Sequence, residues 1–493
     1  MNKSVAPLSS VRKIFALLFS NRWMEQWQLE NPPAGQTKRR QSSGKEKKKK
    51  SPQKHQPRGF YERIFTLRVT LWYLIFQRTN FDQSMAAVVR DLRKGGADRL
   101  GPRGRKASKQ VRSSQTSGYN QARQRMPLEL LQGAFAHVAQ KIISMTGLSA
   151  QRQEEKPGPQ QRERQLLDGS TLRMLSTPEL KKTYRPARGR RGQSDWCLMR
   201  ILVGFCTRTG AMLSAMESPA KVSEQRMAWA ILEKARAFTL WIADRNFGVW
   251  SVVAQAVRYE QDVLVRLTGA RAAKLVKGPA LCSGEDRAVR WEPSRHDQAS
   301  PGTERKPIAG RLLYVRIQRG GKCVDLWLFT TLDAADYPLE LLVQWYGQRW
   351  QAELHFRSVK TQMRLAQLDV CSPEMARKEF YAALLAYNLV RAVMWAAGER
   401  LETGVQSFSF NNARRVLLDW LQDWGRAIGQ GAGSSERWVQ SLLDEVLQQK
   451  LPKRKKPQPS QVRMVRSSGT HWPTLRGSRA SAQKRCEQPT KSS

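Results

Sequence analysis

Between residues 164 and 268 the sequence alternates apolar runs with amphipathic stretches, in an order that few folds accommodate. Short apolar runs bounded by turn residues are typical of buried strands, and longer stretches with apolar residues three or four positions apart are typical of helices. The expected elements are strands at Gln165–Leu172, Cys197–Cys206 and Ala211–Ala215, a helix at Ser223–Arg236, a strand at Phe238–Ala243, a helix at Phe247–Tyr259 and a strand at Asp262–Leu267. This order predicts an α/β layer fold.

The flanking regions predict a helical segment before this layer and a β pair followed by long helices after it. The expected elements are helices at Phe60–Gln77, Asp82–Lys94, Tyr119–Arg125 and Leu128–Ile143, a basic linker at Gly95–Ser117 whose last residue caps the third of these helices, a β pair at Arg311–Ile317 and Val324–Thr330 joined through Gly320-Gly321, and two long helices at Leu339–Leu365 and Pro373–Arg400.

The net charge is the strongest compositional constraint on what the chain binds. Lys and Arg total 85 against 41 Asp and Glu, a formal net charge of +44. Such an excess favours nucleic acid, because neutralised phosphates release counterions. A membrane partner is disfavoured, because no run approaches the ~20 apolar residues of a spanning helix. The six cysteines form no Cys-x-x-Cys pair. A zinc site or a disulfide framework is therefore not expected, and a cytoplasmic setting fits.

The expected helix at 339–365 carries an unusual set of side chains on one stripe. Tyr346, Arg349, Glu353 and Lys360 lie at offsets of 0, 3, 7 and 14, which at about 100° per residue fall within roughly 60° of one another. Such a stripe suits a phosphodiester, with the carboxylate binding a metal and the two cations gripping phosphates. The alternative is a solvent-exposed face with an ordinary i,i+4 ion pair between Arg349 and Glu353.

Two aspartates lie at apolar strands and are candidate partners of Glu353. Asp168 lies in Leu166-Leu167-Asp168-Gly169, and Asp244 directly follows the strand that ends at Ala243. A carboxylate at a buried strand is costly unless it is paired or binds a cation. Each has an ordinary alternative, since Asp-Gly is common in turns and Asp244 could cap the next helix. Three carboxylates without a soft ligand favour Mg²⁺ or Mn²⁺, and two such ions can serve in-line displacement at phosphorus.

The order of these acids and the residues around them resemble the DDE transposases of bacterial insertion sequences. Tyr346-x-x-Arg349-x-x-x-Glu353, followed after six further residues by Lys360, is similar to the Tyr-Arg-Glu-Lys signature of the insertion sequence four family. Asp168-Gly169-Ser170-Thr171 resembles the first acidic motif of that family, and Ala243-Asp244-Arg245-Asn246-Phe247 resembles its second. Asn246 stands where a glycine is expected, which is compatible with a positive φ. Gly347 stands where a polar residue is more usual.

The resemblance implies a fold, a set of site residues and an activity. The implied fold is a ribonuclease-H-like catalytic core interrupted by a β-rich insertion, with a helical N-terminal DNA-binding domain and basic flexible tails. Catalysis and the binding of two Mg²⁺ or Mn²⁺ ions would fall to Asp168, Asp244 and Glu353. Contacts to DNA would come from Tyr346, Arg349, Lys360 and Arg245. The implied activity is cut-and-paste transposition, in which a homodimer cleaves double-stranded element ends through a hairpin intermediate and joins their 3′ ends to target DNA.

The domain organisation follows from the same resemblance and from composition. The expected domains are a basic, largely disordered segment at 1–59, a helical DNA-binding domain at 60–150, a core in two parts at 160–268 and 337–400, a β-rich insertion at 269–336, a C-terminal helical region at 401–449 and a basic tail at 450–493. In the insertion, Trp291 or Trp327 could stack on a flipped base, although core packing is the more ordinary role. Two rival functions stay open, a non-catalytic transposase-derived DNA-binding protein and a structure-specific nuclease on the same core.

Overall fold

The computed structural model describes residues 14, 21–31, 64–100, 106–147, 158–159, 161–189, 192–319, 322–400, 404–427 and 431–451. The described residues within 1–318 and 323–451 belong to one compact unit. Most of the basic segment expected at 1–59, the Gly320-Gly321 turn and the tail beyond Leu451 lie outside the described residues.

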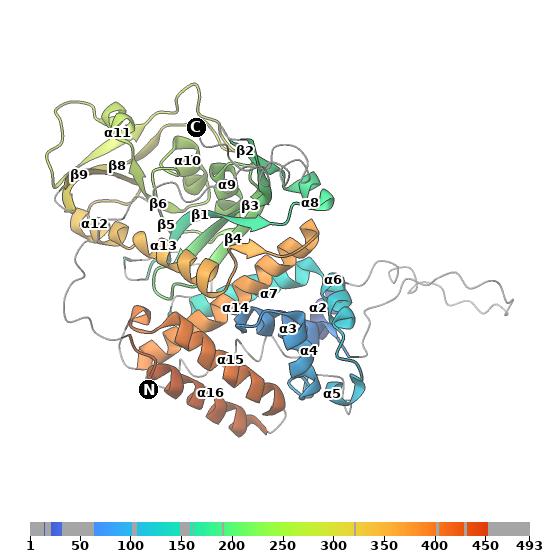
Figure 1. The fold of residues 1–493 in the computed structure, drawn as a ribbon. Coiled ribbons are helices and arrows are strands. Elements are labelled where there is room, and N and C mark those ends of the chain that lie inside the picture. Colours follow the sequence, from blue (N-terminus) through green and yellow to red (C-terminus); the bar gives the residue numbers. More distant parts are fainter. Residues whose placement is uncertain are drawn as a thin grey trace, which may run out of the picture. The chain divides into compact units, whose positions relative to one another are not determined.

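Ten strands of the described chain form one mixed sheet (Figure 1). They are β1 Arg164–Met174, β2 Pro186–Gly189, β3 Gly192–Cys206, β4 Met212–Pro219, β5 Leu240–Ala243, β6 Asp262–Leu267, β7 Glu285–Trp291, β8 Ile308–Arg319, β9 Lys322–Thr330 and β10 Gln367–Leu368. The order is β2-β3-β1-β5-β6-β9-β8-β7, with β4 beside β3 and β10 beside β1. β1 is antiparallel to β3 and parallel to β5, which is parallel to β6. The predicted α/β class is confirmed, and the order is compatible with the expected ribonuclease-H-like core.

Helices cover this sheet and extend beyond it. They are α2 Asn21–Glu30, α3 Leu67–Thr79, α4 Met85–Arg93, α5 Ala107–Gln110, α6 Ser117–Arg125, α7 Leu128–Met145, α8 Pro178–Thr183, α9 Glu224–Lys234, α10 Trp250–Arg258, α11 Gly269–Leu275, α12 Leu339–Gly347, α13 Trp350–Arg357, the π-helix η1 Ser358–Gln362, α14 Pro373–Arg400, the short η2 Val405–Ser407, α15 Phe410–Ala427 and α16 Gly431–Leu447.

Alternate residues of the strands face two different cores, one on each side of the sheet. Leu166 of β1 and Ile242 of β5 lie in the larger core, together with residues of α7, α12, α13 and α14. Leu167 and Ala243 lie in the smaller core with α9 and α10. Because successive side chains of a strand point to opposite faces, the even-numbered positions after Leu166 and Ile242 belong to the larger-core side. Strand alternation therefore directs the residues at 168 and 244 toward the side of the sheet that carries α13.

The single helix predicted at Leu339–Leu365 is wrong, because three shorter elements replace it. Helix α12 ends at Gly347, α13 begins at Trp350, and the π-helix η1 follows from Ser358. At the junction the backbone bonds from Gln348 N to Trp345 O and from Arg349 N to Tyr346 O span three residues instead of four. Glycine favours such an interruption, because it costs about 1 kcal/mol relative to alanine inside a helix. The four candidate residues therefore do not share one straight stripe.

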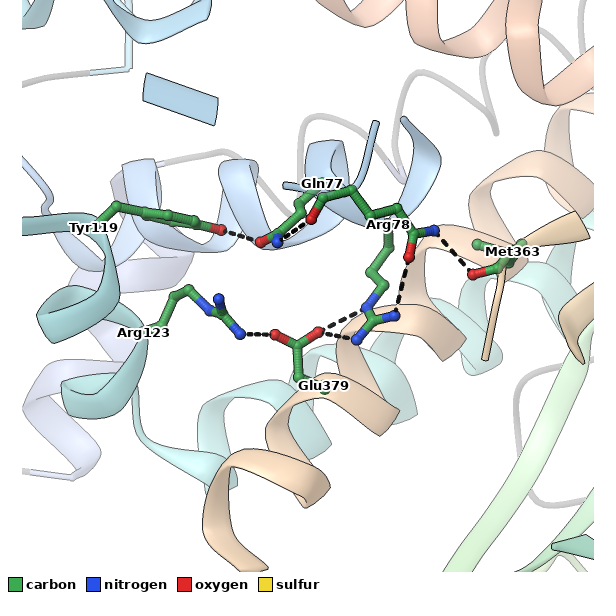
Figure 2. A network of polar contacts seen from close by, with 7 residues as sticks. Gln77, Arg78, Tyr119, Arg123, Met363 and Glu379 are labelled. Atoms are coloured by element: carbon green, nitrogen blue, oxygen red, sulfur yellow. Dashed lines mark hydrogen bonds and ion pairs between the residues drawn. The ribbon is translucent and has the colours of Figure 1, made fainter. Parts of the chain in front are cut away.

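The N-terminal helices α3, α6 and α7 belong to the same core as the sheet. Both α3 and α7 pack along α14. Figure 2 shows a buried network that joins them, in which Glu379 of α14 pairs with Arg78 of α3 and Arg123 of α6. The Arg78 Nε donates to Glu379 Oε2 at 2.7 Å, and Tyr119 Oη donates to Gln77 Oε1 at 3.0 Å. A buried carboxylate thus fixes two helices of the expected DNA-binding region against the core.

Two further expectations about the N-terminal region can be compared with the described residues. Residues 21–30 form a helix although 1–59 was expected to be largely disordered; Met24 is buried there, and Trp23 and Trp27 pack against the larger core. The expected linker at 95–117 is partly packed, since residues 95–97 are buried and α5 follows. Helix α6 begins at Ser117 rather than after it, and no side chain caps it.

The insertion strands β7, β8 and β9 continue the core sheet rather than forming a separate one. β9 pairs antiparallel with β6, and β8 with β7. Strand β7 was not predicted, because charged residues interrupt its apolar positions. Trp291 is buried edge-to-face against Phe329, with ring centroids 4.9 Å apart. Trp327 is partly buried and stacks on Tyr314 at 4.2 Å. Packing therefore accounts for Trp291.

Helix α14 is apolar and long enough to cross a membrane by composition alone. Its apolar stretch is entirely buried within the structure, against α3, α7, α15 and α16. Packing inside the protein therefore accounts for the composition of α14.

Candidate active site

Asp168 and Asp244 occupy neighbouring positions on two adjacent parallel strands. The register pairs Leu167 of β1 with Ala243 of β5, so the next residues along the two strands are the aspartates. Adjacent strands lie about 4.8 Å apart, and both positions are on the side of the sheet that carries α13. The fold thus brings together two acids that are far apart in the sequence.

The ordinary explanations for the two aspartates do not apply. Asp168 and Gly169 lie inside β1 and not in a turn. Asp244 does not cap α10, whose N-cap is Val249. Its Oδ1 instead accepts a hydrogen bond from Asn246 N at 2.9 Å. The Asp244 side chain thus closes a turn with Asn246, and neither the expected turn at Asp168 nor the expected helix cap by Asp244 is present.

The Asp168 carboxyl is held in an environment that disfavours its charge. Burial raises its pKa to about 6, even though Gly169 N–H donates to Oδ1 at 2.9 Å. The Asp244 carboxylate raises the pKa further, and Arg349 opposes the rise. Two anions facing each other in a partly buried site need a positive charge between them. The pair is therefore suited to binding a cation.

Glu353 lies on α13, which contacts β1, and its carboxylate is paired with Arg349. Arg349 Nη2 is 3.3 Å from Glu353 Oε1, and the Glu353 side chain is 45% exposed. The same guanidinium lowers the pKa of Asp168, although burial outweighs it. Arg349 thus interacts with both the strand acid and the helix acid. Among the described residues, no three acidic, His or Cys side chains converge closely enough to hold a metal ion as they stand.

Tyr346 of α12 lies close enough to Asp244 to sense its charge, and Lys360 of η1 lies close to Arg173 of β1. Burial raises the pKa of Tyr346 to about 12, with Arg349 and Arg266 opposing the rise and Asp244 adding to it. Burial lowers the pKa of Lys360, and Arg173 of β1 lowers it further. Lys360 and Arg173 therefore form a pair of neighbouring positive charges, of which Arg173 belongs to β1. Arg173 was not among the predicted site residues.

Arg245 follows Asp244 and is exposed. Arg245 thus lies just beyond the carboxyl end of β5. Of the seven predicted site residues, Asp168 lies in β1, Asp244 and Arg245 follow β5, and the other four lie on α12, between α12 and α13, on α13 and on η1.

Glu224, at the start of α9, is a fourth acid near the site that sequence reasoning missed. A Cβ at position 169 would lie 2.5 Å from Glu224 Cδ, so Gly169 is what allows this carboxylate to lie against β1. Burial raises the pKa of Glu224, Arg200 opposes the rise, and Asp244 adds to it. Asn246 Nδ2 donates to Glu224 Oε2 at 2.7 Å. Asn246 is not among the described residues with positive φ, so it holds Glu224 rather than replacing a glycine for backbone reasons.

The residues around the aspartate pair fit a hard divalent cation. All the nearby candidate ligands are carboxylate oxygens, the donors that Mg²⁺ and Mn²⁺ prefer. The raised pKa of Asp168 reflects burial and repulsion that a cation would relieve. Glu353 is held only by a partly exposed ion pair, and such pairs contribute about 1 kcal/mol or less. Release of Glu353 from Arg349 therefore costs little free energy.

The described site combines a mixed sheet, two aspartates at adjacent strands and a glutamate on a helix that contacts β1. Residues 159–389 match the family described as transposase DDE domain. Over this stretch, which is slightly less than half of the chain, the sequence is similar to transposase DDE domains.

Two curated transposases are similar to parts of the chain. The chain is 28% identical over 291 residues to the transposase InsG for insertion sequence element IS4 of Escherichia coli (strain K12), a match covering 57% of this chain and 62% of the relative. It is 26% identical over 151 residues to the putative transposase y4zB of Sinorhizobium fredii (strain NBRC 101917 / NGR234), covering 30% of this chain and 39% of the relative. Each match spans less than two thirds of the relative's length. The name of the first relative links this similarity to insertion sequence element IS4.

Proposed function

We propose that this chain is a DNA transposase that binds double-stranded element ends, cleaves them in a reaction that requires Mg²⁺ or Mn²⁺, and joins the 3′ ends to target DNA. The observation that carries the proposal is the register that sets Asp168 beside Asp244 on the side of the sheet that faces α13. The match of residues 159–389 to transposase DDE domains supports it. A homodimer acting on paired ends and a hairpin intermediate belong to the same proposal.

The proposed roles divide the site residues into metal ligands and DNA contacts. Asp168 and Asp244 would hold two divalent ions between them, with Glu353 joining after it leaves Arg349. Two such ions would supply charge stabilisation for the attacking and leaving oxygens of an in-line displacement. Once released from Glu353, Arg349 can grip a phosphate through two parallel N–H donors. The exchange of partners would make the assembly of the site depend on DNA.

The remaining predicted residues would position the DNA backbone. Lys360 with Arg173, and Arg245 next to Asp244, would provide cations for phosphate contacts. Tyr346 keeps its hydroxyl proton, because its pKa is raised to about 12, so it can donate a hydrogen bond to a phosphate oxygen. Asp168, Asp244 and Glu353 together lower the affinity for a polyanion in the absence of metal, so DNA and the cations are expected to bind cooperatively.

The function is tested with purified protein and supercoiled plasmids. One plasmid carries the inverted repeats that bracket the gene, and a matched plasmid lacks them. We expect Mg²⁺-dependent excision from the first plasmid alone, with no cutting in EDTA. Cutting of both plasmids to the same extent would favour the structure-specific nuclease. Specific binding of the repeats without cleavage in Mg²⁺ or Mn²⁺ would favour the non-catalytic DNA-binding protein and contradict the proposal.

Replacing Arg349 with alanine is expected to weaken binding to a duplex of the inverted repeat about tenfold, because a charge-assisted hydrogen bond contributes roughly 1.5–3 kcal/mol. Fluorescence anisotropy measures the affinity, and isothermal calorimetry with Mn²⁺ checks that metal binding is retained. Arg349→Lys keeps the charge but loses the two-pronged geometry and should restore only part of the affinity. Arg437→Ala removes an exposed cation of α16 as a control. Full affinity in Arg349→Ala would refute the phosphate contact.

A further inference from the structure

The π-helix η1 carries Lys360. Side chains from other parts of the chain donate hydrogen bonds to the carbonyl groups at its end. Arg364 has φ +54 and closes the turn. Gln83 Nε2 donates to Met363 O at 2.9 Å, and Arg414 Nη1 donates to Gln362 O. Orphan carbonyls at a helix end require such partners. Both donors come from outside this segment, Gln83 from the loop between α3 and α4 and Arg414 from α15.

The Gln83 side chain is held in place by the buried network of Figure 2. Arg78 Nη1 donates to Gln83 Oε1 at 3.4 Å, and the same guanidinium is anchored by Glu379. The Gln77 Nε2 donates to Gln83 O at 2.6 Å, which fixes the backbone. With its acceptor oxygen occupied by Arg78, the Gln83 amide presents its N–H group to Met363. A connected set of polar contacts therefore runs from Glu379 in α14 to the end of η1.

Arg414 supplies a positive charge to the same helix end. Its residue is 1% exposed, and its guanidinium lies 3.9 Å from the centroid of the Phe81 ring. A cation near the C-terminal end of a helix interacts favourably with the carbonyl dipoles. Phe81 lies two residues before Gln83, so Arg414 also packs against the loop that carries the second donor. Arg414 therefore contacts both the end of η1 and the loop that carries Gln83.

We propose that Gln83 and Arg414 are positioning residues for Lys360, and that they fix the end of the π-helical turn so that Lys360 meets a DNA phosphate in one direction. The inference rests on the proposed function, because it assigns Lys360 a phosphate. π-Helical turns are rare in proteins, and those that occur are often found at functional sites. Binding a phosphate costs conformational entropy, because Lys360 has a long flexible side chain. A backbone that is already ordered before DNA binds reduces the total conformational entropy lost. The arrangement links the N-terminal helices to the DNA contact.

The test is a double-mutant cycle between Gln83 and Lys360, read by the affinity for the inverted-repeat duplex. Gln83→Ala is expected to weaken binding about fivefold and Lys360→Ala about tenfold, since each loses a hydrogen bond of roughly 1–1.5 kcal/mol. The double variant should bind no more weakly than Lys360→Ala, because Gln83 acts through Lys360. Gln83→Glu keeps the acceptor for Arg78 but loses the donor to Met363, and it should bind as weakly as Gln83→Ala.

Several outcomes would overturn the proposal. Losses that multiply in the double variant would show that Gln83 acts independently of Lys360. Wild-type affinity in Gln83→Glu would show that the bond to Met363 is irrelevant. Wild-type affinity in Lys360→Ala would remove the contact that Gln83 is proposed to orient, while cleavage by the wild-type protein would leave the proposed function intact. Failure of the wild-type protein to bind or cleave the repeats would instead contradict the proposed function itself. Melting temperatures identify any variant whose loss arises from unfolding.

Discussion

Replacing Asp244 or Asp168 with asparagine is expected to abolish metal-dependent cleavage of the inverted-repeat plasmid, with a loss in rate on the order of 10³-fold or more. The carboxylates are proposed to hold the ions that stabilise charge on both oxygens of the displacement, an effect of several kcal/mol, and each 1.36 kcal/mol corresponds to a factor of ten. Asparagine keeps the shape and one acceptor oxygen but removes the charge. Cleavage assays in Mg²⁺ and in Mn²⁺ measure the effect, and calorimetry with Mn²⁺ should show weakened binding.

The melting temperature distinguishes this loss from unfolding. Because the folded-state pKa of Asp168 is raised from 3.8 to about 6, mainly by burial, the stabilising form is the protonated one. Its contribution is fully present below pH 3.8 and is lost as the pH rises through about 6. At pH 7.5 in EDTA, Asp168→Asn should therefore melt at a higher temperature than the wild-type protein. A lower melting temperature together with lost cleavage would show that Asp168 stabilises the fold, and the catalytic assignment would lose its support.

Replacing Glu379 with alanine is expected to lower the free energy of unfolding by about 3–5 kcal/mol, the usual cost of removing one partner from a buried ion pair. The Glu379 side chain is 3% exposed, and its loss leaves Arg78 and Arg123 buried without a counter-charge. Urea denaturation followed by tryptophan fluorescence measures the change. Glu292→Ala is the control, since Glu292 is paired with Arg290 on the surface, and such pairs contribute about 0.2–1 kcal/mol.

The pH dependence of the same variants tests the charge of Glu379. Burial alone would raise its pKa, but Arg78 and Arg123 outweigh burial and hold the pKa below its ordinary value of 4.5. The stabilisation is therefore present above pH 4.5 and is lost as the pH falls through the lower folded-state value. Glu379→Gln should lack this part of the acid destabilisation. Equal acid sensitivity in Glu379→Gln and the wild-type protein, or a cost for Glu379→Ala no larger than for Glu292→Ala, would contradict the role of the network.

The succession of strands along the sequence was predictable, because apolar runs in this chain are short and bounded by turn residues. The prediction for Asp262–Leu267 coincides with β6, and the strands at Gln165 and Phe238 overlap β1 and β5. The positions of Asp168 and Asp244 relative to these strands followed directly. Strands β2 and β7 were missed, since β2 is only four residues long and charged residues interrupt the apolar positions of β7.

The parts of the candidate site that could not be predicted depend on contacts between distant residues. Periodicity treats residues 339–365 as one helix, because the three-residue hydrogen bonds around Gln348 leave the apolar spacing almost unchanged. The approach of Glu224 to Gly169 brings α9 against β1, and the sequence around either residue does not predict it. The caps on η1 come from residues 83 and 414, far from Lys360 in sequence. Each of these features arises only after the chain has folded.

The division between α12 and α13 separates two requirements that a continuous helix would have coupled. Tyr346 and Trp345 are anchored in the core by α12, whereas Glu353 lies on a helix of only eight residues that begins after the interruption. Substitutions near Gln348 could therefore adjust the reach of the glutamate by small rotations without repacking the sheet. Related enzymes could in this way diverge in the DNA geometry they accept while keeping the two aspartates unchanged.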